Sequence, residues 1–159
     1  MYYFDYAYTG KGTTKIKAES GATKTKKAPS CKNRFHYITR TAHYKNHKDN
    51  LHEKVEYVKS GNMPSFAENR PDIFWEAAHN YERKNARTAA SQVIALPKEL
   101  SVQQRIELAE ALIKQFTHEF NFPYTAAIHN HAGEIGGQDQ PHLHIMYCER
   151  SVDEHNRTA

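Results

Sequence analysis

Two strand-like segments near the C-terminal end place the strongest constraint on how this 159-residue chain can fold. They are residues 124–130 (YTAAIHN) and 142–148 (HLHIMYC), and the connection between them, HAGEIGGQDQP, contains three glycines and a proline. Two such segments around a turn-forming connection predict a β-hairpin with a long, flexible loop. The hairpin in turn determines which residues of the two segments can face one another.

Three histidines of this hairpin are candidate metal ligands. His142 and His144 are two residues apart in a strand, so their side chains leave the same face. If His129 lies opposite His142, then His144 lies opposite Ala127, and all three imidazoles can reach one ion. Three neutral imidazoles leave a divalent ion its full charge and open positions for a phosphate oxygen. His131, nearer the loop, is an alternative ligand.

The predicted metal is a divalent cation, although chance clustering is an alternative because the chain contains 11 histidines. Imidazole ligands favour manganese, cobalt, nickel or zinc over magnesium, which prefers oxygen donors. Phosphate and water would supply those oxygens, so Mn²⁺ and Mg²⁺ are the favoured candidates, with Ni²⁺, Co²⁺ and Zn²⁺ as alternatives.

The rest of the chain predicts an α/β fold with a mostly antiparallel β-sheet and helices packed on its outer face. Ser101 and Gln104 form a capping box before an amphipathic helix that extends to about residue 120. Other predicted elements are a strand over residues 1–8, a basic flexible loop over about 9–34, a short helix over 33–46, a helix from Pro71 to about residue 90 and a strand over 92–96. No domain boundary is evident, so residues 1–159 are expected to form a single domain.

Charge and cysteine content indicate the partner and the compartment. Residues 1–60 contain 13 lysines and arginines against 5 acidic residues, a balance that favours a polyanion such as nucleic acid, although a solvated lysine-rich loop is the alternative. Cys31 and Cys148 are too few for a disulfide framework and are interpreted as reduced thiols. No segment resembles a membrane span or a signal peptide, so a cytoplasmic protein is expected.

The ordered motifs resemble those of MobA/MobL mobilisation relaxases, within the His-hydrophobic-His endonuclease superfamily. The metal motif is matched by YTAAIH and QPHLHIM, in which Leu143 is the hydrophobic residue between two histidines. The segments SGNMPSF, FWEAAHNYERKNAR and ALPKEL precede it in the family's order, so the resemblance covers residues from about 35 to 150. It implies a sandwich fold like that of relaxases and rolling-circle initiators.

The resemblance also selects a nucleophile. The segment FHYITR is similar to the family's tyrosine segment, which makes Tyr37 the predicted nucleophile and Tyr44 the alternative. The implied activity is metal-dependent, site- and strand-specific nicking and rejoining of DNA through a 5′-phosphotyrosyl intermediate, for plasmid mobilisation. Lys32, Arg34 and Arg40 flank Tyr37 and are candidate phosphate contacts. The implied partners are single-stranded DNA at a transfer origin and accessory mobilisation proteins, and a monomer is expected.

One departure from the family leaves the general base unassigned. Such relaxases often carry an acidic residue on the strand entering the ALP segment, but residues 90–94 (ASQVI) contain no carboxylate. Three rival functions remain open at this point: a rolling-circle replication initiator, a hydrolase that uses water as nucleophile, and a non-catalytic single-stranded DNA-binding module with a structural metal.

Overall fold

The computed structural model describes residues 4–10, 13–17, 21, 23–27, 30–46, 53–82, 87–132, 139–151 and 153. Within them, a five-stranded antiparallel sheet has the order β1-β5-β7-β6-β4, and β2 and β3 form a separate two-stranded ladder. The strands are β1 (Phe4–Gly10), β2 (Thr13–Lys17), β3 (Thr23–Lys27), β4 (Glu53–Gly61), β5 (Arg87–Ala95), β6 (Tyr124–Ala132) and β7 (Asp139–Tyr147), and the helices are α1 (Cys31–Thr39), α2 (Pro71–Tyr81) and α3 (Val102–Thr117), with short 3₁₀ turns η1 (Ala42–Tyr44) and η3 (Ser65–Ala67).

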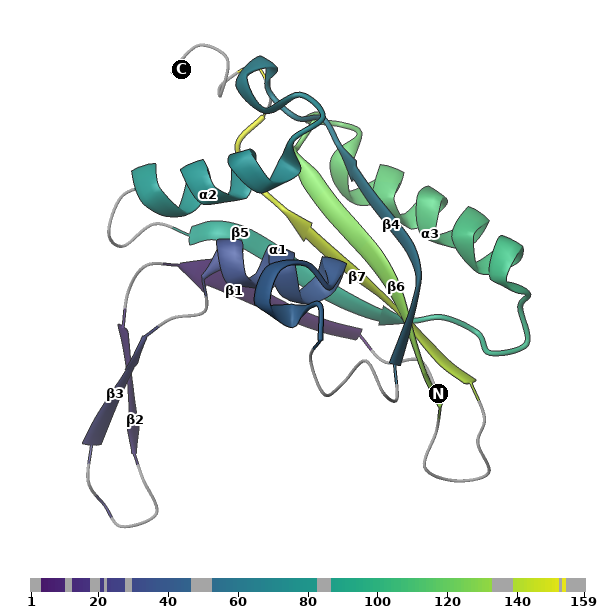
Figure 1. The fold of residues 1–159 in the computed structure, drawn as a ribbon, viewed down its shortest axis with the longest axis horizontal. Helices are drawn as coiled ribbons and strands as arrows, with labels where there is room; N and C mark the ends of the chain where they lie inside the picture. Colours follow the sequence, from purple (N-terminus) through teal and green to yellow (C-terminus); the bar gives the residue numbers. More distant parts are fainter. Residues whose placement is uncertain are drawn as a thin grey trace.

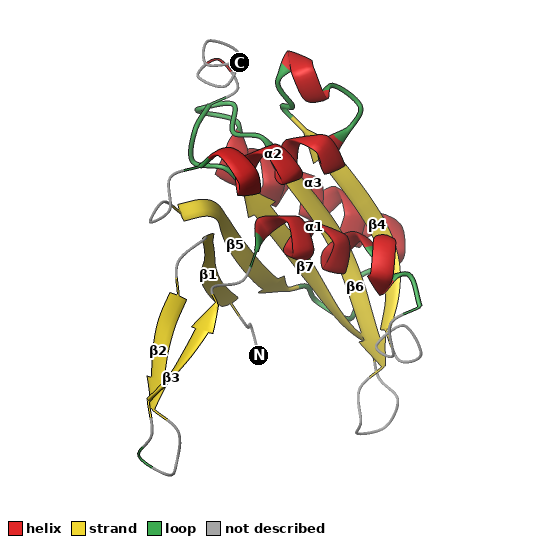
Figure 2. Ribbon diagram, turned by 60° about the vertical axis from the view of Figure 1, so that its left-hand side comes forward, coloured by secondary structure: helices red, strands yellow, loops and turns green. Residues whose placement is uncertain are grey.

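Helices cover both faces of the five-stranded sheet. Helices α1 and α2 lie on one face and α3 lies on the other, while the β2–β3 ladder extends away from the sheet beside β1 (Figures 1 and 2). The predicted α/β class with an antiparallel sheet is therefore confirmed, with helices on two faces instead of one. No helix of the described segments is long and apolar enough to cross a membrane.

The predicted hairpin is the centre of the sheet. Strands β6 and β7 pair antiparallel, with His129 opposite His142 and Ala127 opposite His144, which is the register expected from the sequence. Ile128 and Leu143 point to the opposite face, where both are fully buried beneath α3. A one-residue slip would exchange these two faces, so burial of the apolar side chains holds the histidines in register.

Helix α3 begins at the predicted capping box. Ser101 Oγ accepts from the backbone N–H of Gln104, and Gln104 Oε1 accepts from the backbone N–H of Ser101. Ala109 and Ile113 form the buried stripe of the helix. The helix ends at Thr117, a little before the predicted end.

Helix α2 is shorter than predicted. Pro71 occupies the first turn as expected, and Phe74, Trp75 and Ala78 are buried against α1 and the sheet. The helix ends at Tyr81, which is 87% exposed and not part of the packed face. The residues assigned to the end of that helix instead begin β5, because pairing with β1 and β7 overrides the helical preference of its alanines.

Strand β4 was not predicted, and the segment 9–34 is not a continuous loop. Strand β4 lies at the sheet edge, carries several charges and contains a bulge between Val55 and Tyr57, so its sequence lacks a regular alternation. Within residues 9–34, β2 and β3 pair antiparallel and α1 begins at Cys31. Residues 1–3 of the first predicted strand lie outside the described residues.

Candidate metal and nucleophile site

His129 lies at the centre of the candidate site. Its side chain is fully buried, and Nε2 donates to the backbone carbonyl of Ile38 at 2.6 Å, because a carbonyl oxygen can only accept. A neutral ring with its hydrogen on Nε2 has a lone pair on Nδ1. Among the residues that the structure describes, this buried Nδ1 has no hydrogen-bond partner, and its distance of 3.6 Å to Glu53 Oε1 is too long for a hydrogen bond. A buried acceptor of this kind fits a metal ligand oriented by a backbone carbonyl.

His144 lies beside His129, with 4.4 Å between the ring centroids. Burial lowers the pKa of His144 well below its usual range, and the nearby His129, Arg34, His142 and Arg40 lower it further. Arg34 Nη2 lies 3.5 Å from Nδ1 of the ring. The His144 imidazole is therefore held in its neutral form, which is the form that binds a metal.

Glu53, the first residue of β4, is a candidate metal ligand that the sequence analysis missed. Burial would raise the pKa of this carboxyl, but the interactions with His129, Arg40 and His131 outweigh burial, so the pKa is lowered. Glu53, His129 and His144 each offer one ligand atom, and these atoms lie within 4.8 Å of one another. The only sequence signal was an acidic residue in an unassigned segment.

His142 lies on the same face of β7 as His144 but is not part of this group of three. Its Nδ1 donates to the backbone carbonyl of Gln140 at 2.9 Å. His131, the alternative ligand, pairs in the ladder with Glu53 on one side and Gln140 on the other. The structure thus brings two of the three predicted histidines together with a carboxylate, and the three-histidine centre stays a prediction.

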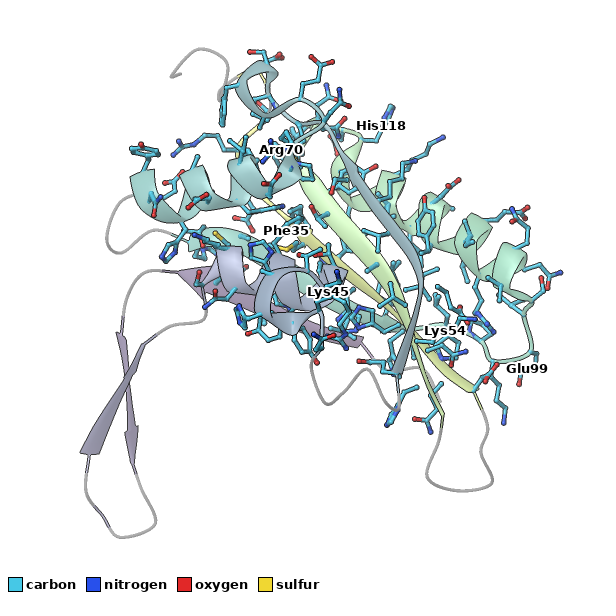
Figure 3. The ribbon with its side chains drawn as sticks, in the orientation of Figure 1. Phe35, Lys45, Lys54, Arg70, Glu99 and His118 are labelled. Carbon is cyan, nitrogen blue, oxygen red and sulfur yellow. The ribbon has the colours of Figure 1, made fainter. Side chains whose placement is uncertain are left out.

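Tyr37 is positioned by α1. Ser30 caps this helix by accepting from the backbone N–H of Asn33, and the helix buries Phe35 and Ile38 against α2 and the sheet. Phe35 lies where α1 meets α2, and the exposed Lys45 lies beyond the C-terminal end of α1 (Figure 3).

The Tyr37 ring lies between the candidate ligands and a second tyrosine. Its centroid is 6.4 Å from the His129 ring and 5.4 Å from that of Tyr44, which it meets edge to face. The predicted nucleophile therefore lies beside a candidate ligand, and the alternative nucleophile is its neighbour.

Arg40 connects Tyr37 to Glu53. Its backbone adopts the left-handed conformation (φ 54°) at the end of α1, which directs the chain back along the helix. The guanidinium carbon lies 4.4 Å from the centroid of the Tyr37 ring, Nη1 donates to the Tyr37 carbonyl at 2.7 Å, and Nη2 forms an ion pair with Glu53. The Arg40 side chain is only 7% exposed, so it lies within the candidate site and does not project to solvent.

The other two candidate DNA contacts lie at more accessible positions. Lys32 pairs with Glu76 of α2 at 2.8 Å, and both side chains are at least 40% exposed. Arg34 is half-buried, with its guanidinium carbon 5.7 Å from the Tyr37 ring centroid and Nη2 near His144. Arg34 thus lies near both the predicted nucleophile and a candidate ligand.

The donor set can be compared with the metals expected from the sequence. The Glu53 carboxylate adds a hard oxygen donor to the imidazoles of His129 and His144, which suits Mn²⁺ and Mg²⁺ better than imidazoles alone. Cys31 and Cys148 are free thiols buried in the core beneath α1 and α2, and neither belongs to the ligand group. The arrangement lacks the cysteines that are usual in structural zinc sites.

Comparison with known proteins gives consistent relatives. The chain is 42% identical over 117 residues to a 43 kDa relaxation protein of Salmonella typhimurium and 39% identical over 123 residues to mobilization protein A of Escherichia coli. These matches cover 74% and 77% of this chain but only 30% and 16% of the relatives, so the chain spans less than a third of their length. A probable mobilization protein MobA of Bifidobacterium longum is 31% identical over 84 residues, covering 52% of this chain and 14% of the relative.

Structural comparison agrees at the level of the fold. A solved structure from a study of the molecular basis of vancomycin resistance transfer in Staphylococcus aureus superposes with a TM-score of 0.61, covering 98% of this chain and 74% of that chain at 21% identity. Residues 23–159 match the MobA/MobL family, which is most of the chain. This protein therefore belongs to the MobA/MobL family.

Proposed function

We propose that this chain is the DNA-nicking domain of a mobilisation relaxase, in which Tyr37 attacks a phosphate of single-stranded DNA. The observation that carries the proposal is the hydrogen bond from His129 to the Ile38 carbonyl, because it joins the helix of Tyr37 to the candidate metal ligands. The Salmonella and Escherichia coli relatives, named for relaxation and mobilization, support the same activity. The site of action is the cytoplasm, and the protein acts as a monomer.

The proposed reaction exchanges one phosphate ester for another. The phenol oxygen of Tyr37 forms a bond to phosphorus as the bond to the 3′ oxygen breaks. The phenol proton is released and the departing oxygen takes up a proton, which leaves a 5′-phosphotyrosyl link and a free 3′-hydroxyl. The Arg40 guanidinium over the ring stabilises the negative charge that develops on the phenol. Because the ester bond is conserved, the strand can be rejoined by the reverse reaction.

The residues that would hold a divalent ion are Glu53, His129 and His144, with His142 as a further ligand from the same face of β7. Mn²⁺ and Mg²⁺ are the favoured ions. A bound ion supplies positive charge that polarises the scissile phosphate and offsets the charge that grows during transfer.

Single-stranded DNA at a transfer origin is the proposed substrate, and accessory mobilisation proteins are proposed partners. Arg34 and Lys32 on α1 would contact backbone phosphates, which position the strand without reading its sequence. Since Arg34 also approaches His144, it would place a phosphate between the nucleophile and the ligands.

A covalent-adduct assay tests this function. The protein is mixed with Mn²⁺ and a pool of labelled single-stranded oligonucleotides that includes transfer-origin sequences of the relatives, and the products are separated on a denaturing gel. We expect a slow, protease-sensitive band that Tyr37→Phe abolishes and that His144→Ala weakens. Matched controls are Tyr81→Phe, which changes an exposed tyrosine of α2, and His118→Ala, which changes an exposed histidine beyond α3.

Other outcomes select other functions. An adduct that is lost in Tyr44→Phe but retained in Tyr37→Phe would identify Tyr44, and not Tyr37, as the nucleophile. Free cleavage products without any adduct would indicate a hydrolase. Binding of the oligonucleotides without cleavage, in protein shown to contain Mn²⁺, would favour a non-catalytic DNA-binding module.

A further inference from the structure

A chain of hydrogen bonds runs from a buried ion pair on the α3 side of the sheet to the ring of His142. Arg105 of α3 donates from Nε and Nη2 to the two carboxylate oxygens of Glu56, at 3.0 and 2.7 Å. Both side chains are only 4% exposed. Such a buried, bidentate pair is expensive to desolvate and contributes more to geometry than to stability.

The bulge in β4 allows the Glu56 carboxylate of this ion pair to bind a side chain of β6. In the ladder Val55 pairs with His129 and Tyr57 pairs with Ile128, so Glu56 is the extra residue of the bulge. Its carboxylate also accepts a hydrogen bond from Nδ2 of Asn130, at 2.9 Å. The ion pair thereby holds the side chain of the residue that directly follows His129.

Asn130 connects the ion pair to β7 through a second hydrogen bond. Its Oδ1 accepts from the backbone N–H of Gln140 at 3.1 Å, next to Pro141, which has no N–H to donate to the ladder. The carbonyl of the same Gln140 then accepts from His142 Nδ1 at 2.9 Å. A ring whose hydrogen is held on Nδ1 presents the lone pair of Nε2, which is the tautomer that a ligating histidine needs.

We propose that Glu56, Arg105 and Asn130 form a positioning network that holds His142, through the Gln140 backbone, ready to ligate a divalent ion with Nε2. The proposal rests on the metal centre of the proposed function. The network explains why a buried ion pair and a bulge occur behind the candidate site. It also explains how His142 can be oriented although it lies outside the group formed by Glu53, His129 and His144.

The test combines metal binding with a spectrum of the metal-free protein. Calorimetric titration with Mn²⁺ compares wild type, Asn130→Ala, His142→Ala and the double variant. We expect Asn130→Ala to weaken binding by about 10-fold or more, the usual effect of losing an outer-shell partner. In the His142→Ala background the same change should have no further effect, because the network acts through that ring.

A nitrogen-15 spectrum of the histidine rings reports the tautomer without metal. The His142 ring should be in the Nδ1–H form in wild type and shift toward a mixture in Asn130→Ala. Gln115→Ala, which removes an exposed amide of α3, is the matched control. Thermal melting verifies that each variant is folded, and Asn130→Ser provides a second, smaller change if Asn130→Ala does not fold.

The outcomes separate this inference from the proposed function. Wild type that binds Mn²⁺ while Asn130→Ala binds it equally well would overturn the network and leave the metal centre intact. Equal weakening by Asn130→Ala with and without His142 would also overturn it, because the effect would then bypass that ring. Wild type that binds no Mn²⁺ would refute the metal centre itself, and with it the role assigned to the network.

Discussion

At the scale of single residues, the site depends on groups that are held in one protonation or tautomeric state. His129 is oriented by a backbone carbonyl, and burial keeps His144 neutral. The pKa of Glu53 is lowered because the interactions with His129, Arg40 and His131 outweigh its burial. Glu53, His129 and His144 thus offer ligand atoms that lie within 4.8 Å of one another, which is an arrangement that a cation would stabilise.

The lowered pKa of His144 predicts an acid sensitivity of the fold. As the pH falls below about 6.5, histidine in the unfolded chain takes up a proton, whereas the folded ring resists protonation. The unfolded state then binds more protons, so the free energy of unfolding decreases from neutral pH toward pH 5 and is unaffected by this group above about pH 7.

Urea denaturation at several pH values, in a chelator, measures this effect. We expect His144→Gln to flatten the decline between pH 7 and pH 5, while His118→Gln, at an exposed position, leaves it unchanged. An equal decline in wild type and His144→Gln would show that other groups cause the acid sensitivity.

Arg40 is predicted to act on Tyr37 and not as a DNA contact. Removing the guanidinium in Arg40→Gln should slow adduct formation roughly 2- to 30-fold, the equivalent of about 0.5–2 kcal/mol for a cation over an aromatic ring. Affinity for an uncleaved oligonucleotide should change little, as measured by fluorescence anisotropy. A parallel loss of oligonucleotide affinity and of the rate of adduct formation would instead indicate that Arg40 contacts a phosphate. Lys32→Gln is the comparison, because Lys32 is proposed to be such a contact.

At the scale of elements, caps and close approaches hold the helices and the edge strand in place. The capping box of α3 satisfies two backbone groups at the helix start, on the far side of the sheet from the candidate site. Ser101→Ala should lower the free energy of unfolding by about 1 kcal/mol, measured by urea denaturation. Gln103→Ala, an exposed change within the same helix, should have a smaller effect, and equal effects would argue against a role for the cap.

The end of β4 is predicted to require glycine. A Cβ placed on Gly61 would lie 2.6 Å from the Oη and Cε1 atoms of Tyr124, its partner in the ladder. Gly61→Ala should therefore displace the tyrosine ring from its contact with α3 and destabilise the fold by about 1–3 kcal/mol. An unchanged denaturation midpoint would mean that the ring moves aside at no cost.

At the scale of the whole molecule, one sheet separates two cores, and the candidate ligands face only one of them. The α3 face contains apolar side chains and the buried ion pair, and the α1–α2 face contains the candidate site together with both thiols. Burial raises the pKa of Cys31, and raises the pKa of Cys148 to about 11. Both thiols are therefore expected to be unreactive while the α1–α2 core is closed.

Thiol labelling tests whether this core opens with the rest of the molecule. Reaction with an aromatic disulfide reagent should be slow in native protein and accelerate in proportion to any loss of global stability, as in Gly61→Ala. Single Cys31→Ala and Cys148→Ala variants assign the two rates. Fast labelling of Cys31 alone in stable protein would show instead that α1 opens independently.

The sequence predicted the central hairpin, and the register that was supposed for it, with His129 opposite His142, is confirmed. Period-two spacing of His142 and His144, with His129 on the partner segment, was enough to predict which residues share a face, because strand geometry is local and regular. Capping and helical spacing likewise predicted α3. The family resemblance selected Tyr37, and the structure places it beside the ligand face.

The remaining parts of the candidate site depend on contacts between elements that are far apart in the sequence. Glu53 lies on an edge strand whose bulge and charges disrupt the regular alternation of polar and apolar residues. It lies near His129 in the fold although the two residues are 76 positions apart in the sequence (129 − 53). The left-handed turn that directs Arg40 onto Tyr37 and the carbonyl of Ile38 that orients His129 have no pattern in the sequence. These contacts join elements that are distant in the sequence and that meet only when both cores are packed. The spacing of residues within one element therefore cannot predict them.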